Sequence, residues 1–194
     1  MNNIFVYCEI TDTGIVADIS LELLSKGRKL ADKLSVKLEA IVLGNNLKDV
    51  KKQLSYYGVD TIYLAEDSRL FPYLTLPHSS IVVDIIKKEK PQIVLFGATS
   101  IGRDIAPRIA SALRCGLTAD CTSLEIGDYS ENKTKKVFKN LLYQIRPAFG
   151  GNIIATIVNP KTLPQMATVR EGVMKNEKLS EPSNPQIKNI DINN

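Results

Sequence analysis

The stretch that decides the fold runs from residue 91 to residue 122 and reads PQIVLFGATSIGRDIAPRIASALRCGLTADCT. It opens on an apolar strand at 93–96, which breaks at Gly97. A loop of small and polar residues follows, and a helix is predicted from about Asp104 to Leu113, with Pro107 in its first turn. The apolar residues of this helix recur at spacings of three and four: Ile105, Ile109, Ala112 and Leu113. Such a strand, polar loop and amphipathic helix form the building unit of open α/β sheets.

The chain before this stretch repeats the same alternation. Strands are predicted at 4–10, 37–43, 61–64 and 93–96, and helices starting near Asp18, at 47–57, at 79–89 and near Asp104. The strands are nearly continuous apolar runs, as expected for parallel strands that are buried on both sides. The sequence therefore predicts an α/β fold with a doubly wound, mainly parallel sheet and helices on both faces.

The last third of the chain shows a different pattern. Four strands are predicted there without intervening helices, at 122–126, 136–144, 152–158 and 164–169. The polar loop at 127–132 predicts a hairpin, so part of this addition is expected to be antiparallel. The segment 175–194 is polar, carries two prolines and has no apolar period. We expect one domain over 1–174, followed by a linker or disordered tail over 175–194.

Composition excludes several classes of function. The formal net charge is only +4, positive and negative residues are mixed, and tryptophan is absent, which argues against nucleic-acid binding. No apolar run is long enough to cross a bilayer. The three cysteines show no CxxC spacing, and a strand begins almost at once, which makes a signal peptide unexpected. These features predict free thiols and a cytoplasmic setting.

The sequence contains no recognisable catalytic motif. A phosphate loop, a GxGxxG turn after the first strand, a GxSxG elbow and an HExxH pair are all absent. The one histidine, His78, falls in a predicted loop that contains proline. We therefore expect neither catalytic residues nor a metal site.

The first candidate site is the loop after the strand at 93–96. Gly102 would permit close approach of the backbone, and Thr99, Ser100 or Asp104 could cap the helix. Arg103 projects from the same loop, which would face a cofactor or a partner at the carboxyl end of a strand. The plain alternative is a capped strand-to-helix turn with a surface arginine.

Two further segments are weaker candidates. Arg146 is predicted at the end of a strand, and Gly150 and Gly151 would turn the chain into the next strand. Arg146 and exposed backbone N–H groups could meet an anionic or redox ligand, although a glycine hairpin explains the pattern equally well. The third candidate is the segment 116–122 around Asp120. The plain alternative is that the Asp120 carboxylate only binds nearby backbone N–H groups.

Three segments in order resemble one protein family. The run GATSIGRDIAPRIASALRCGLTADCT, together with RPAFGGNIIATI and PQMATVREGVM, is similar to the amino-terminal domain of electron transfer flavoprotein α subunits. The resemblance covers roughly residues 4–174. In that family the flavin-binding domain is carboxy-terminal, and the resemblance implies that this domain lies beyond the present chain.

The resemblance also carries functional expectations. It implies pairing with an electron transfer flavoprotein β subunit, FAD held by the full heterodimer rather than by this chain alone, and electrons received from an acyl-CoA dehydrogenase or a similar donor. The chain would thus serve an electron carrier and would not be a catalyst. The residues expected to face the flavin or the partner are Thr99, Gly102, Arg103, Asp104, Arg146, Gly150 and Gly151.

A second hypothesis rests on fold analogy alone. The same sheet occurs in the universal-stress and adenine nucleotide α-hydrolase-like group, so the chain could be a stand-alone module that binds AMP or ATP. The glycine-rich phosphate signature of such modules is not evident after the strand at 93–96.

Overall fold

The computed structural model describes residues 2–151 and 153–192. Its strands are β1 (Ile4–Cys8), β2 (Leu38–Gly44), β3 (Thr61–Glu66), β4 (Ile93–Gly97), β5 (Leu117–Cys121), β6 (Ser123–Ser130), β7 (Val137–Ala148), β8 (Ile153–Ile157), β9 (Gln165–Val169) and β10 (Gln186–Asn189). Its α-helices are α1 (Asp18–Leu34), α2 (Val50–Ser55), α3 (Thr75–Glu89) and α4 (Ser100–Leu113), and two short 3-10 turns are η1 (Ser68–Leu70) and η2 (Phe149–Gly151).

Seven strands form one parallel sheet in the order β10-β3-β2-β1-β4-β9-β5. β1 lies at the centre, and its Ile4 pairs with Leu38 on one side and Ile93 on the other. All five residues of β1 are buried, which explains its continuous apolar run.

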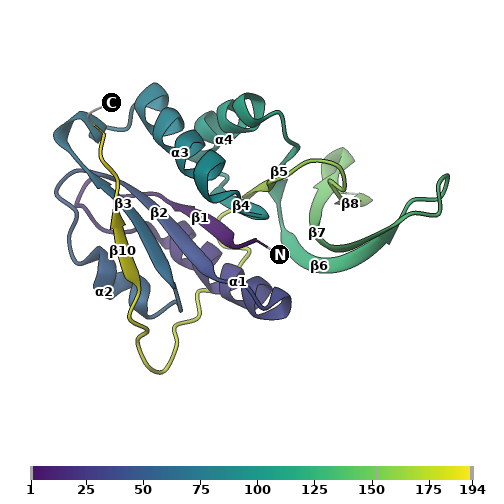
Figure 1. Cartoon of the computed structure of the whole chain (residues 1–194), viewed down its shortest axis with the longest axis horizontal. Helices are drawn as coiled ribbons and strands as arrows, with labels where there is room; N and C mark the ends of the chain where they lie inside the picture. The colour runs from purple at the N-terminus through teal and green to yellow at the C-terminus, as the bar shows by residue number, and fades with distance from the viewer. Residues whose placement is uncertain (1, 152, 193–194) are drawn as a thin grey trace.

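Helices cover both faces of this sheet, so the predicted doubly wound fold is confirmed (Figure 1). Successive side chains of a strand point to opposite faces. Val6 of β1 therefore packs in a core with α1 and α2, whereas Phe5 and Tyr7 pack in a second core with α3 and α4.

The strands β6, β7 and β8 form a separate antiparallel sheet beside the main one (Figure 1). Its inner face joins the core on the side of α1 through Leu124 and Leu142. The Lys33 ammonium of α1 also donates to the Ile126 carbonyl at 2.9 Å. The predicted antiparallel strands are thus confirmed, but they form a sheet of their own, while β9 returns to the main sheet as a parallel strand between β4 and β5.

Some predicted boundaries were wrong. Helix α4 begins at Ser100, because Thr99 and not Asp104 is its N-cap, and Pro107 therefore lies inside the helix rather than in its first turn. Strand β6 continues to Ser130, beyond the start of the predicted hairpin loop. Helix α3 begins at Thr75, which places His78 in a helix and not in a loop.

The expected linker or disordered tail also differs from the structure. Residues 186–189 form β10, which pairs in parallel with β3 at the edge of the main sheet. The segment leading to it is tied down as well, because Leu179 N–H donates to Tyr56 O at 2.7 Å and Ser183 Oγ donates to Ser55 O at 3.0 Å. Backbone hydrogen bonds to an exposed strand edge need no apolar period, so the sequence pattern gave no sign of them. We call residues 177–192 the strap.

We predict that the strap contributes to the stability of the domain. A chain ending at Asn176 should have a free energy of unfolding lower by about 2–4 kcal/mol, since several hydrogen bonds worth about 0.5–1.5 kcal/mol each are lost. Urea denaturation of the two chains measures this difference. Identical transition midpoints would show that the strap adds nothing.

Candidate functional site

The central crevice of the sheet lies between β1 and β4, where the strand order reverses. Helix α1 follows β1 onto one face, and α4 follows β4 onto the other. Because the two connections diverge, the carboxyl ends of β1 and β4 are where open α/β sheets generally bind ligands. This edge carries the first of the predicted sites.

Thr99 closes this crevice. Its hydroxyl accepts a hydrogen bond from Gly102 N–H at 2.9 Å and donates one to the Glu9 carboxylate, just beyond β1, at 2.8 Å. Glu9 is only 7% exposed. Burial raises the pKa of the Glu9 carboxyl above its usual value, and the hydrogen bond from Thr99 opposes part of this effect.

Gly102 allows the start of α4 to pack closely against the end of β4. A Cβ on Gly102 would overlap the Gly97 carbonyl group, and a Cβ on Gly97 would lie 2.9 Å from Glu9 Oε1. The first turn of α4 thus lies directly against the end of β4. The close backbone approach predicted for Gly102 is real, but its neighbour is the protein itself.

Little space remains beside the Glu9–Thr99 hydrogen bond. A cavity of about 30 Å³ lies there, lined in part by Tyr7, Glu9, His78 and Ile101. That volume suits a single water molecule, whereas sites for drug-sized ligands occupy about 300–1,000 Å³. The geometry therefore gives no support to an adenine nucleotide bound in this crevice.

Asp104 holds two helices together. It lies in α4, and its carboxylate accepts hydrogen bonds from Tyr73 at 2.8 Å and from Thr75 at 2.5 Å, next to the start of α3. Arg108 forms an ion pair with it at 3.6 Å. These partners, the Thr75 hydroxyl first, hold the pKa of Asp104 below its usual value. The expected helix cap is thus a link between α3 and α4.

Arginines gather around Asp120, at the neighbouring ends of β4, β5 and β9. Arg170 binds both carboxylate oxygens of Asp120, at 3.2 and 2.6 Å. Arg103 donates to Ala98 O at 2.7 Å and approaches Asp120 to 3.7 Å. Arg146 acts on the same carboxylate electrostatically, and together the three arginines, Arg170 foremost, lower the pKa of Asp120.

An irregularity in β5 sets the position of Asp120. The register with β9 shifts between Thr118 and Cys121, and Asp120 has a φ of 61°. Bulges of this kind redirect a side chain at the end of a strand. Three guanidinium groups around one carboxylate leave a positive excess, which suits contact with an anionic group.

Arg146, Gly150 and Gly151 are only partly brought to this cluster. Arg146 lies within β7, opposite Ala155 of β8, and not at a strand end. The glycines form the η2 turn with φ of 68° and 93°, and a Cβ on either would meet nothing within 4 Å in the part of the chain that is described. They form the open turn of the antiparallel sheet.

Sequence reasoning missed Arg170 and ranked Asp120 third. Arg170 directly follows the predicted strand at 164–169. Had that strand been assigned to the parallel sheet beside β4, its end would have indicated the same edge as Arg103.

A model of the electron transfer flavoprotein domain family matches residues 4–193. The chain belongs to the electron transfer flavoprotein family.

Individual members of the family agree with this assignment. The electron transfer flavoprotein subunit alpha of Thermoanaerobacterium thermosaccharolyticum is 43% identical over 173 residues, which are 89% of this chain and 49% of that protein. The protein of the same name from Clostridium acetobutylicum is 45% identical over 172 residues, 89% of this chain and 48% of the relative. The acryloyl-CoA reductase electron transfer subunit beta of Anaerotignum propionicum is 38% identical over 192 residues, 92% of this chain and 52% of the relative. The chain thus spans about half the length of the curated relatives it matches.

Electron transfer flavoproteins, as a family, bind a flavin in the heterodimer. The crevice between β1 and β4 is closed by Glu9 and Thr99. Arg170 is held by the Asp120 carboxylate, and Arg103 by the Ala98 carbonyl and Asp120. At most, the arginines could contact an anionic group of a ligand. These residues do not enclose a ring system.

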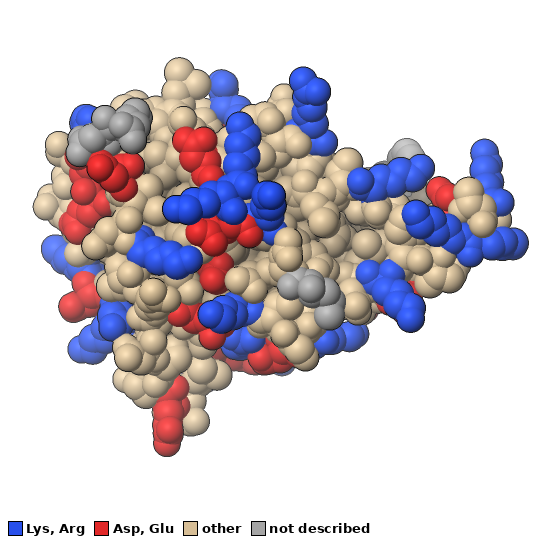
Figure 2. Space-filling view, in the orientation of Figure 1, with Lys and Arg blue, Asp and Glu red and all other residues tan. Residues whose placement is uncertain are grey.

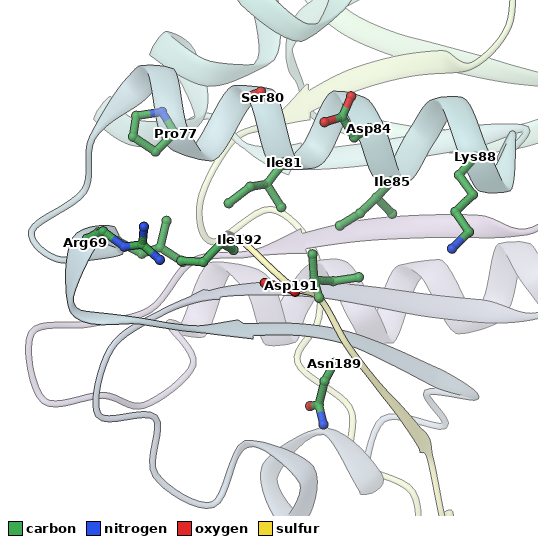
Figure 3. Close-up of a pocket in the computed structure, with 12 residues that line it drawn as sticks. Arg69, Pro77, Ser80, Ile81, Asp84, Ile85, Lys88, Asn189, Asp191 and Ile192 are labelled. Carbon is green, nitrogen blue, oxygen red and sulfur yellow. The ribbon is translucent and has the colours of Figure 1, made fainter. Parts of the chain in front are cut away.

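A larger groove lies at the other side of this family domain. It has a volume of about 590 Å³ and runs between α3 and residues 189–192 of the strap (Figure 3). Ile81 and Ile85 point into it from α3, and Ile192 faces them from the strap. The strap forms one wall of this groove, which the sequence therefore could not indicate.

Over 2–151 and 153–192, no helix has the length and apolarity required to span a membrane. The same residues contain no group of three or more metal-ligating side chains.

We predict that Glu9 makes stability depend on pH. A carboxyl whose folded-state pKa is raised adds stability below its unfolded pKa and loses that contribution as pH rises through the folded value. Glu9→Gln keeps an oxygen that can accept from Thr99 but cannot ionise. The variant should therefore be more stable than the wild type near pH 8, with the difference shrinking towards about pH 4.

Urea denaturation from pH 4 to pH 8 checks this expectation. Ser20→Ala, next to Glu9, is the matched control, because Ser20 Oγ accepts from Glu9 N–H and has no charge to titrate. A Glu9→Gln variant that is less stable than the wild type at pH 8 would contradict the prediction.

Proposed function

We propose that this chain is the amino-terminal domain of an electron transfer flavoprotein α subunit. It pairs with a β subunit in an FAD-containing carrier that takes electrons from a dehydrogenase, such as an acyl-CoA dehydrogenase, to an acceptor. The observation that carries the proposal is the identity of 43% and 45% to two α subunits over 89% of this chain. In this proposal the flavin does the redox chemistry, and the domain supplies a scaffold.

Strand β8 supports pairing with a second subunit. Among the residues that the structure describes, it is an edge strand, hydrogen-bonded to β7 and to no other strand. Two of its successive residues are exposed isoleucines, Ile153 at 53% and Ile154 at 73%. Exposed apolar edge strands invite pairing with another chain, and natural proteins usually cover or charge them. We assign this edge to the β subunit.

The arginines near Asp120 would form a polar part of the proposed subunit interface. Arg103 and Arg146 present positive charge at the end of the sheet where β5 leads into the antiparallel sheet. Such a cluster suits an acidic or phosphate group on the partner side of the interface. Thr99, Gly102 and Asp104 support this edge from within. A cytoplasmic setting also belongs to the proposal, and the three free thiols are in keeping with it.

We predict that Ile154→Lys weakens pairing with the β subunit. The lysine adds a charge to an exposed edge and leaves the core untouched, so the fold should persist while affinity for the β subunit falls by at least about tenfold. Co-purification of tagged chain with co-expressed β subunit measures the loss. Leu76→Lys is the matched control, because Leu76 is 71% exposed on α3, away from β8. If both variants retain the β subunit equally, β8 is not the interface.

We also predict that the lone chain binds neither flavin nor adenine nucleotide. Its absorbance between 300 and 550 nm should show no flavin bands, and calorimetric titration with AMP or ATP should show no binding heat, because the crevice near Glu9 is filled. Stoichiometric FAD on the lone chain would overturn the scaffold proposal. Tight binding of AMP or ATP would favour the universal-stress type of module.

A further inference from the structure

The hairpin of β6 and β7 projects from the body of the molecule (Figure 1). Four lysines occupy its end, namely Lys133, Lys135, Lys136 and Lys139, and we call them the lysine tip. All four are exposed. Figure 2 shows blue side chains gathered at the far end of this projection, whereas both signs of charge are mixed over the body.

The lysine tip holds a large part of the positive excess of the chain. Residues 127–140 contain four lysines against two acidic residues, an excess of two charges. This is half of the formal net charge of +4, in fourteen of 194 residues. The potential of the molecule is therefore concentrated at one end.

The acidic residues of the hairpin do not neutralise these lysines. Asp128 accepts from the backbone N–H of Asn140 at 2.9 Å, and Glu131 accepts from the Thr134 hydroxyl and pairs with Lys161 at 3.8 Å. Within the described residues, no ammonium group of the lysine tip lies within 4.0 Å of a carboxylate. Four charges are thus available for a partner.

The turn that carries the lysines is ordered. Lys135 N–H donates to Glu131 O at 2.8 Å, and Glu131 N–H donates to Lys136 O at 2.9 Å. Lys136 also lies over the ring of Phe138, 4.9 Å from its centroid. A fixed backbone reduces the conformational entropy that is lost when the charges meet a partner.

We infer that the lysine tip docks the acidic surface of a protein that exchanges electrons with the carrier. The inference rests on the proposed function, because a carrier must meet and leave its partners rapidly, and complementary charge raises the rate of such encounters. A nucleic acid fits the surface less well. A polyanionic strand needs a basic track with stacking side chains, and here the positive charge ends at one hairpin.

The test compares two variants that lose the same charge. Lys133→Gln/Lys135→Gln/Lys136→Gln removes three of the four charges of the lysine tip, and Lys48→Gln/Lys51→Gln/Lys52→Gln removes three exposed lysines in or just before α2. The probe is a fluorescent peptide of twelve glutamates, measured by anisotropy at low ionic strength. We expect the tip variant to bind at least about tenfold more weakly than the wild type and the α2 variant to change less than about twofold.

Parallel measurements use a single-stranded oligonucleotide of matched charge and vesicles containing anionic lipid. Equal losses in the two variants would overturn the inference, because net charge alone would then explain binding. Tip-dependent binding of the oligonucleotide or the vesicles that is tighter than binding of the peptide would overturn it in favour of those partners. The peptide assay needs no β subunit, so its failure leaves the proposed pairing intact, and loss of pairing leaves the assay unaffected.

Discussion

The close contact between the end of β4 and the first turn of α4 governs the rest of this structure. Neither Gly97 nor Gly102 has a Cβ, so strand and helix approach until only backbone lies between them. Thr99 uses its one hydroxyl twice, to cap α4 and to bind Glu9 beyond β1. The two central strands are thereby joined across the point where the strand order reverses. The usual ligand crevice of this sheet class is filled by the protein itself.

Because the central crevice is filled, the charged and exposed apolar groups that could contact a ligand or partner lie outside it. The charged cluster around Asp120 lies beyond the ends of β4, β5 and β9, and the antiparallel sheet is an excursion of the chain from β5 to β9. Exposed apolar residues of β8 and the lysine tip both belong to that excursion. Exposed apolar and charged groups on such an excursion are features on which the proposed pairing with a second subunit rests.

Much of the fold could be predicted from local pattern. The strands 4–10, 37–43, 61–64 and 93–96 and the helices between them were recognisable, because buried parallel strands require continuous apolar runs and covering helices require apolar spacings of three and four. The strap and β5 were missed for a related reason. Four-residue β10 gains its place through backbone hydrogen bonds at a sheet edge. The two buried residues of β5, Thr118 and Cys121, lie three positions apart around the bulge at Asp120, so neither strand carries a clear period.

For the candidate site, too, some features follow from local sequence and others from tertiary contacts. The sequence by itself indicated a strand-to-helix turn after Gly97 with Thr99 as a possible cap, since glycines and a capping threonine have local conformational consequences, but it placed the start of the helix four residues too late. Only the tertiary structure decided which side chains these residues meet. Thr99 binds Glu9, and Asp104 binds Tyr73 and Thr75, which lie between β3 and β4 in the chain. Arg170 and Arg103 both pair with Asp120. The side chains that form hydrogen bonds with Thr99 and Asp104 lie 29 to 90 positions away in the chain. Local pattern specifies backbone shape, whereas the meeting of distant side chains depends on the order in which the strands enter the sheet.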